Sequence, residues 1–271
     1  MRVLITGAGT GIGRACALYL AEQGHMVIAA GRRAEPLETL AAEAKGEVRV
    51  QTLDVTDPQS IEDALPNISP VEALINNAGV SVMGSLEGVG LAEWRRQYEV
   101  NVFGVVAMIQ AVLPQMRQRG GGRIVTIGSV TGRLVPPFMG AYGSSKHALE
   151  GITDALRREV KAMGIHVSLV RPGFVNTAFG EQEQASLKKH EHDAYTQAQR
   201  RFAVWHHDNG HKSAPDPKVV AVAVERALTE TPPRTRYAVP ASAIRLIGLR
   251  NWLPAPLIDR IMERTLKRGG A

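Results

Sequence analysis

The sequence has 271 residues, of which 44% are hydrophobic and 27 are glycine, and it carries a net charge of +6 at pH 7. A chain of this size can bury a large core, as one α/β domain or as two small ones. Its single cysteine, Cys16, excludes an internal disulfide and is typical of a reducing compartment. Because its neighbours are apolar, Cys16 is expected to be buried and inert rather than a nucleophile.

The chain has more basic than acidic residues and a pI near 9.7, which raises the question of nucleic acid binding. The basic residues are mostly dispersed and lack the interleaved aromatic residues of a single-strand binder, so no nucleic acid partner is expected. The first residues lack the pattern of a signal peptide, and no apolar run reaches the roughly 18 residues of a membrane span. We therefore expect a cytoplasmic protein.

Short apolar runs typical of buried strands alternate with helical patterns along most of the chain. Strands are predicted at 2–6, 26–30, 48–53, 72–76, 123–127 and 165–170, with a last short strand at 237–239. Helices are predicted at 13–23 (with Gly24 as C-cap), 35–45, 58–65, 92–118, 142–163 and 219–229. This alternation, with strands apolar on both faces, predicts one α/β domain over residues 1–271, a Rossmann-type, doubly wound parallel sheet with helices on both faces.

A glycine-rich turn, Thr6-Gly7-Ala8-Gly9-Thr10-Gly11-Ile12-Gly13, joins the first strand to the first helix. Glycines let the backbone approach a pyrophosphate, whose charge is met by the N–H groups at the helix N-terminus. The spacing is Thr-Gly-x-x-x-Gly-x-Gly, and four glycines in seven positions disfavour the alternative of a turn that serves packing alone. The predicted cofactor-binding residues here are Gly7, Thr10, Gly11, Ile12 and Gly13.

The second strand ends in Gly31-Arg32-Arg33, where a cofactor site for NAD would place Asp or Glu. Two guanidinium groups can instead bind a 2′-phosphate, so Arg32 and Arg33 favour NADP over NAD, which stays possible. Position 10 holds Thr10, where a basic residue would be a further indication of NADP. The alternative is a solvated pair of charges at the start of a helix.

Tyr142 and Lys146 are four residues apart on a predicted helix, so their side chains share one face. An ammonium beside a phenol favours the phenolate, and Lys146 is therefore expected to lower the pKa of Tyr142. Tyr142 then becomes a candidate proton donor and acceptor for an alcohol or carbonyl. Taken alone, the pair could equally be a tyrosine packed on a lysine stem.

Asn76-Asn77-Ala78-Gly79 after the fourth strand and Ser129 after the fifth complete a pattern that resembles the short-chain dehydrogenase/reductase family over roughly residues 1–177. The resemblance implies a catalytic tetrad of Asn101, Ser129, Tyr142 and Lys146, in which Asn101 lies at a local kink of its helix. It also implies cofactor contacts by Tyr142 and Lys146 and by three further segments. These are Asp54 and Val55; Asn77, Ala78 and Gly79; and Pro172, Gly173, Val175 and Thr177.

Residues 178–216 are polar, rich in Gln, Lys and His, and show no clear strand. They follow the sixth strand, at the end of the sheet where ligands bind, and are predicted to form a substrate lid that is solvated and mobile. The histidines at 190, 192, 206, 207 and 211 have no familiar ligand spacing, so no metal is expected. Apolar groups for a hydrophobic substrate could come from Phe138, Met139, Phe179, Phe202, Val204 and Trp205.

Residues 241–271 are expected to form a C-terminal extension with six basic and two acidic residues between 245 and 268. It loosely resembles the tails of hydroxysteroid- and retinol-dehydrogenase-like members. Helices that pack across the substrate cleft or at a subunit interface are favoured over peripheral contact with a membrane. The resemblance of helices 92–118 and 142–163 to subunit-pairing helices of the family implies a homodimer or homotetramer.

These features predict an NADP(H)-dependent oxidoreductase that interconverts a carbonyl and an alcohol on a hydrophobic small molecule, with Tyr142 as acid and base. One alternative is an NAD-dependent hydroxysteroid-type dehydrogenase. The other is a protein that senses NADP without turnover, which need not retain Ser129, Tyr142 and Lys146 together.

Overall fold

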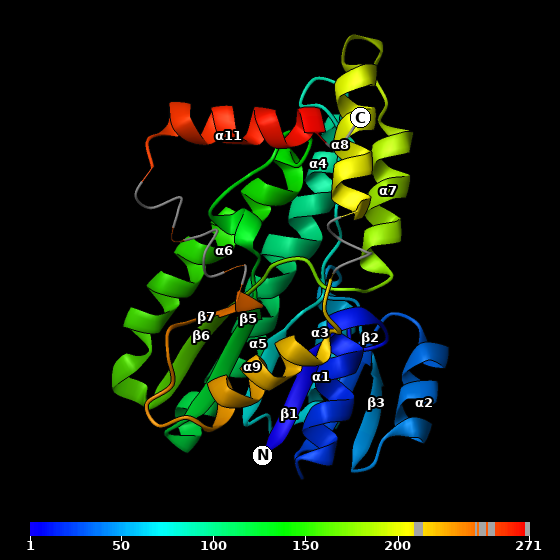
Figure 1. Ribbon diagram of the computed structural model, residues 1–271. Helices are drawn as coiled ribbons and strands as arrows, with labels where there is room; N and C mark the ends of the chain where they lie inside the picture. The colour runs from blue at the N-terminus through cyan, green and yellow to red at the C-terminus, as the bar shows by residue number, and fades with distance from the viewer. Residues whose placement is uncertain (209–213, 242, 244–247, 249–252, 269–271) are drawn as a thin grey trace.

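A seven-stranded parallel sheet forms the centre of the computed structural model, which describes residues 1–208, 214–241, 243, 248 and 253–268 (Figure 1). The strands are β1 (Arg2–Thr6), β2 (Met26–Gly31), β3 (Val48–Thr52), β4 (Ala73–Asn76), β5 (Gly122–Ile127), β6 (Ile165–Pro172) and β7 (Arg236–Val239). Their order is β3-β2-β1-β4-β5-β6-β7. Successive strands are therefore added outward on one side from β1 to β3 and on the other side from β4 to β7. Doubly wound folds bind their ligands at this switch point between β1 and β4.

Helices cover both faces of this sheet, as the alternating pattern predicts. One face carries α1 (Gly11–Glu22), α2 (Ala34–Glu43) and α9 (Lys218–Thr229), and α1 lies against α9 (Figure 1). The opposite face carries α3 (Pro58–Ile68), α5 (Gly104–Arg119) and α6 (Gly140–Glu159). The two layers of helices bury two separate apolar cores, so the single-domain α/β fold is confirmed.

Strand β1 shows why its sequence is apolar without interruption. Val3 and Ile5 point into the core under α1 and α9, whereas Leu4 points into the core under α3 and α5. All three are fully buried. Because successive side chains of a strand point to opposite faces, a strand covered on both sides needs apolar residues at every position.

The predicted helix at 92–118 is interrupted. It consists of α4 (Leu91–Tyr98), a π-helical segment (Glu99–Phe103) and α5, so the expected kink at Asn101 takes the form of one widened turn. The predicted helix at 142–163 begins earlier, at Gly140, ends at Glu159 and is followed by a 3₁₀ turn, Lys161–Met163. A π segment inside an α-helix frequently marks a functional position.

By length and composition alone, helical residues Leu91–Arg119 could cross a membrane, although polar residues such as Asn101 and Gln110 interrupt the apolar run, as the sequence indicated. Within the described residues no other helix meets that test. In the fold, α5 packs on β4 and β5, and 44% of the most apolar window is buried. Since the core helix of a soluble protein meets the same test, this is weak evidence for a membrane span.

The segment expected to be a solvated lid is mostly helical, with α7 (Phe179–Lys189), a 3₁₀ turn (Asp193–Tyr195) and α8 (Thr196–His207). Leu187 and Phe202 bury the inner faces of α7 and α8 in a third apolar cluster, which also contains Tyr142. Figure 1 shows these helices and α11 (Ala255–Arg268) beyond the carboxyl ends of the strands. The part of the C-terminal extension at 242, 244–247, 249–252 and 269–271 lies outside the described residues, as does His211.

Candidate active site

A cavity of about 510 Å³ opens at the carboxyl ends of the strands, around the switch point between β1 and β4. The segments that follow β1 to β6 line one part of it, and α7, α8 and α11 close another part. The predicted cofactor-binding and catalytic residues line this cavity, with two exceptions. Gly13 and Asn101 lie behind it and support its wall.

The glycine-rich turn has the close packing that its sequence suggests. Gly7 and Gly11 have φ angles of 65° and 55°, in the left-handed region that favours glycine. A Cβ on Gly13 would overlap the carbonyl oxygen of Gly7 and the side-chain amide of Asn77. Helix α1 begins at Gly11, so its first N–H groups border the cavity and can bind an anion there.

Asn77 joins the ends of β1 and β4. Its Nδ2 donates to the carbonyl oxygens of Thr6 and Gly7, both at 3.0 Å. The Thr6 hydroxyl oxygen accepts from the backbone N–H groups of Asn77 and Ala78, both at 3.1 Å. These bonds hold the glycine turn against the segment after β4, so Asn77 shapes the cavity wall as well as lining it.

The ends of β2 and β3 form the opposite wall of the cavity. Arg32 and Arg33 line it with exposed side chains, and neither forms an ion pair within the described part of the chain. Asp54 accepts hydrogen bonds from the backbone and hydroxyl of Thr56 at 2.9 and 2.7 Å. The two guanidinium groups are therefore available to an anionic ligand, whereas one oxygen of Asp54 is already engaged.

Ser129 follows β5 and caps the 3₁₀ turn Val130–Gly132. Its Oγ accepts hydrogen bonds from the backbone N–H and the hydroxyl of Thr131, at 3.1 and 2.9 Å. A serine hydroxyl has two acceptor lone pairs and one proton. With both lone pairs engaged by Thr131, Ser129 is left to donate its proton into the cavity.

Tyr142 and Lys146 lie on α6, 9% and 5% exposed, and both line the cavity. Lys146 Nζ donates to the carbonyl oxygen of Ile127 at 2.8 Å and lies 5.7 Å from the centre of the Tyr142 ring. Burial lowers the pKa of Lys146 to about 8.

The expected depression of the Tyr142 pKa by Lys146 is wrong. Burial, with a smaller contribution from the Glu183 carboxyl, raises the pKa of Tyr142 well above its ordinary value, and a hydrogen bond with Ser129 opposes that rise. Desolvation of the phenolate is the largest cause of the shift. The phenol is consequently protonated at neutral pH.

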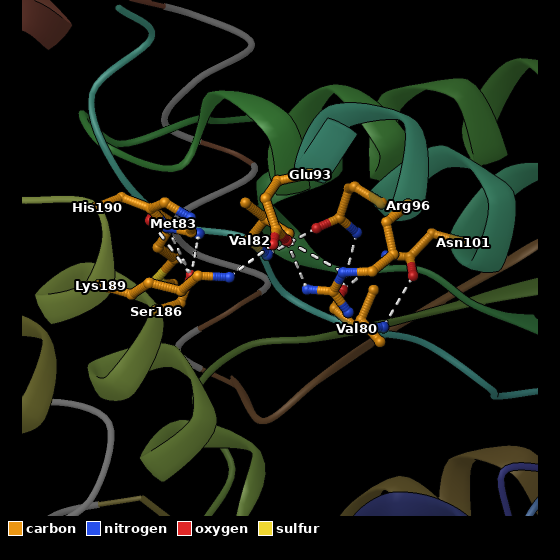
Figure 2. A network of polar contacts seen from close by, with 10 residues as sticks. Val80, Val82, Met83, Glu93, Arg96, Asn101, Ser186, Lys189 and His190 are labelled. Carbon is orange, nitrogen blue, oxygen red and sulfur yellow. Dashed lines mark hydrogen bonds and ion pairs between the residues drawn. The ribbon is translucent and has the colours of Figure 1, made fainter. Parts of the chain in front are cut away.

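Asn101 lies in the π segment and is almost fully buried. Figure 2 shows its contact with Val80: Oδ1 accepts from the Val80 N–H at 2.8 Å, and Nδ2 donates to the Val80 carbonyl at 3.0 Å. Nδ2 also lies 3.3 Å from the Ser145 hydroxyl on α6. Asn101 therefore fixes the chain after β4 against α6, close to Tyr142 and Lys146.

Helix α7 is tied to the same loop and to α4 (Figure 2). The Ser186 hydroxyl accepts from the Met83 N–H at 2.9 Å, and His190 Nδ1 lies 3.0 Å from the Met83 carbonyl oxygen. Lys189 pairs with Glu93 on α4 at 2.6 Å. Three side chains near the end of α7 thus fix its position over the cavity.

The end of the cavity beyond Tyr142 is largely apolar. It is lined by Met139, Phe174, Phe179, Trp205 and, from α11, Ile258 and Met262. Phe202, which the sequence suggested as a wall, is fully buried behind it, and Val204 is 48% exposed and does not line it. Phe138 packs against Phe202 with ring centres 5.6 Å apart. The C-terminal extension, where described, crosses the cleft as expected.

Residues 1–188 match the family described as short chain dehydrogenase. The chain belongs to the short-chain dehydrogenase family. This short-chain dehydrogenase is 32% identical over 273 residues to the uncharacterized oxidoreductase YusZ of Bacillus subtilis, with 97% of each chain covered. It is 33% identical over 269 residues to the 3-ketodihydrosphingosine reductase of Bacteroides thetaiotaomicron, with 98% of this chain and 96% of that one covered.

Solved structures of short-chain dehydrogenases have the same fold. One from Streptomyces avermitilis superposes with a TM-score of 0.80 at 30% identity, covering 99% of this chain and 97% of the other. A serine dehydrogenase in complex with NADP⁺ gives 0.76 at 27% identity, covering 89% and 96%. One from Burkholderia phymatum in complex with NAD gives 0.76 at 28% identity, covering 92% of each chain. The chain is accordingly an NAD(P)-dependent oxidoreductase.

The residues of this short-chain dehydrogenase fit such a dinucleotide. The cavity offers a glycine cradle at a helix N-terminus for the pyrophosphate and two arginines without ion-pair partners among the described residues. On the far side of the cradle, a Cβ added at Gly11 would lie 3.5 Å from Thr177 Cβ, and both residues line the cavity, so the loop after β6 borders the same space.

The structure also places in the cavity a carboxyl group that the sequence did not predict to belong to the site. Glu183 lines it from α7 and is buried. In the sequence it stands in Gly180-Glu181-Gln182-Glu183-Gln184, where no pattern distinguishes it from its solvated neighbours. Among the described residues, no group of three or more His, Cys, Asp or Glu side chains could hold a metal.

Proposed function

We propose that this short-chain dehydrogenase is an NADP(H)-dependent enzyme that interconverts a carbonyl and a primary or secondary alcohol on a hydrophobic small molecule. The observation that carries the proposal is the position of Ser129, Tyr142 and Lys146. They line one cavity, between the glycine cradle and an apolar end. That order matches a cofactor at one end and a hydrophobic substrate at the other.

The chemistry is divided among the three side chains. Ser129 donates a hydrogen bond to the substrate oxygen and holds it beside Tyr142. Tyr142 gives a proton to that oxygen in reduction and takes one in oxidation. Lys146 binds the cofactor ribose and places its positive charge near the phenol. The bound nicotinamide supplies or accepts the hydride.

The protonated state of Tyr142 supports its role as the proton donor in reduction near neutral pH. A phenol whose pKa is raised by burial keeps its proton and can give it to a developing alkoxide. In the opposite direction a phenolate is needed, which the same burial disfavours. Asn101 supports this arrangement through Val80 and Ser145 rather than from the cavity itself.

Arg32 and Arg33 support NADP over NAD, since both face the cavity at the end of β2 without ion-pair partners in the part of the chain described. The apolar end supports a hydrophobic ketone or alcohol of steroid, retinoid or aryl size. The named activities of two similar proteins, on 3-ketodihydrosphingosine and on serine, are consistent with reaction at a carbonyl or alcohol carbon.

The same proposal includes a cytoplasmic location, supported by the single cysteine, and a homodimer or homotetramer that pairs through α5 and α6. Light scattering coupled to size-exclusion chromatography tests the oligomer. A monomer at micromolar concentration would contradict it.

A panel of aryl, steroid and aliphatic ketones, followed by NADPH and NADH absorbance, tests the proposed activity. We expect turnover of hydrophobic ketones and a higher kcat/KM with NADPH. Consistently tighter NADH binding would favour the NAD-dependent alternative. Tight NADPH binding with no turnover of any ketone or alcohol would favour a sensing role.

Thr131→Val tests whether the Thr131 hydroxyl positions Ser129 to donate its proton to the substrate. The variant removes the hydroxyl that bonds Ser129 Oγ at 2.9 Å, and we expect kcat to fall about fivefold, as for one lost hydrogen bond. KM for NADPH should change little, because Thr131 positions Ser129. Thr131→Ser keeps the hydroxyl and should restore kcat. Equal kcat values for the valine variant and the wild type would contradict this role.

A further inference from the structure

Glu183 places a carboxyl group in the substrate end of the cavity. It is only 8% exposed and lines the same cavity as Ser129 and Tyr142. It follows Phe179 by one turn of α7, and the Phe179 ring lies 6.0 Å from the Tyr142 ring, centre to centre. Its carboxyl also acts electrostatically on Tyr142. The carboxyl therefore lies near the position of the reacting carbon.

The groups around this carboxyl come from three elements. His206 on α8 approaches it, with Nε2 3.4 Å from Glu183 Oε2. Ser81, in the chain after β4, lies near it and partly opposes the effect of burial, although its hydroxyl forms no full hydrogen bond in the structure. Tyr142 faces it from α6. Burial raises the pKa of Glu183 to about 8, so the ionised carboxylate is disfavoured until a cation stands beside it.

Attachment of α7 does not explain why a carboxyl is placed here. Ser186, Lys189 and His190 already fix that helix to the Met83 loop and to α4. The neighbours of Glu183 on the same face, Phe179 and Leu187, are apolar and pack in the third cluster. An apolar residue at position 183 would continue that face, and a buried carboxyl is unfavourable there unless its charge is compensated, for which the structure offers the His206 imidazole at 3.4 Å.

Aromatic rings stand at the same end of the cavity. Phe174 and Trp205 line it with ring centres 5.8 Å apart, and the Phe174 ring lies 5.3 Å from that of His206, the partner of Glu183. Aromatic faces attract cations, and a buried carboxyl that ionises beside a bound cation supplies the opposite charge. A carboxyl beside aromatic rings in an otherwise apolar pocket suits an ammonium group on a hydrophobic molecule.

We propose that Glu183 binds a substrate ammonium group close to the reacting carbon, so that the enzyme selects hydrophobic amino ketones and amino alcohols. This inference rests on the proposed carbonyl–alcohol activity and adds the class of substrate. Glu183 is then a specificity-determining residue. Proton transfer stays with Tyr142.

Two alcohols of nearly equal shape test the inference: 2-amino-1-phenylethanol and 1-phenyl-1-propanol, which carry an ammonium and a methyl group at the same position. Initial rates of NADP⁺ reduction near neutral pH give kcat/KM for each. We expect the wild type to prefer the amine. Glu183→Gln should lower kcat/KM for the amine about 10- to 100-fold, the worth of a hydrogen bond to a charged group, and leave the other alcohol nearly unchanged.

Glu181→Gln is the matched control, because it removes the same charge from an exposed position of the same helix. It should leave both rates at wild-type values. Thermal unfolding of each variant separates loss of binding from loss of fold. The preference of the wild type for the amine needs no variant, so it tests the inference even where Glu183→Gln does not fold.

The outcomes separate this inference from the proposed function. Equal wild-type kcat/KM for the two alcohols, or an equal loss for both in Glu183→Gln, overturns the ammonium site and leaves the carbonyl–alcohol activity standing. Failure to oxidise either alcohol, together with failure on the whole ketone panel, overturns both.

Discussion

Replacing Tyr142 with phenylalanine is expected to lower kcat for ketone reduction about 10²- to 10⁴-fold, the usual contribution of a positioned general acid. Tyr142 is the phenol at the junction of the cradle and the apolar end, and burial keeps it protonated at neutral pH. The phenyl ring of the variant keeps the contact with Phe179, so α6 and α7 should stay in place. Stopped-flow or steady-state NADPH absorbance gives kcat.

The controls for this variant separate chemistry from binding. NADPH affinity, measured by fluorescence titration, should change little, because the glycine cradle and the arginines are untouched. Tyr195→Phe removes the hydroxyl of an exposed tyrosine that bonds Glu87 at 2.9 Å, and it should keep full activity. A Tyr142→Phe enzyme that reduces ketones at a near-native rate would show that the assigned mechanism is wrong.

The sheet could be predicted because its strands are covered on both faces. Val3, Leu4 and Ile5 must all be apolar when helices lie above and below them, and such a run is visible in one sequence. The glycine turn could also be predicted, since Gly7 and Gly11 adopt positive φ and a side chain at position 13 would have no room.

The substrate end could not be predicted in the same way. Helices α7 and α8 bury only narrow faces, such as Leu187 and Phe202, and the rest of each helix is polar, so the segment resembles a solvated loop. Glu183 lies among other polar residues and is distinguished only by where α7 places it. Tertiary contacts carry this information, and local patterns do not.

The pKa of Tyr142 shows the same limit within the site itself. Spacing along one helix correctly placed Lys146 near the phenol, and from that alone a lowered pKa follows. The depth of burial, with a smaller contribution from the Glu183 carboxyl on α7, reverses the direction of the pKa shift. Neither is a property of the Tyr-x-x-x-Lys motif, so the motif predicts which residue moves the proton but not its resting state.

The second large effect is expected from the arginines at the end of β2. Replacing both Arg32 and Arg33 with alanine should raise the Kd for NADPH about 100-fold, since each guanidinium can contribute a charge-assisted hydrogen bond worth about 1.5–3 kcal/mol. Affinity for NADH, which lacks the 2′-phosphate, should change far less. Titration with both cofactors measures the ratio, and a higher salt concentration should reduce the NADPH advantage of the wild type.

Arg49→Ala is the matched control, because Arg49 is exposed on β3, pairs with Glu47 and lies outside the cavity. It should leave both affinities unchanged. An equal loss for NADPH and NADH in the double variant would show that the two arginines shape the site without binding a 2′-phosphate. The single variants then decide how the phosphate is held. If both guanidinium groups bind it, the two losses should not add, because neighbouring residues that share a ligand are energetically coupled.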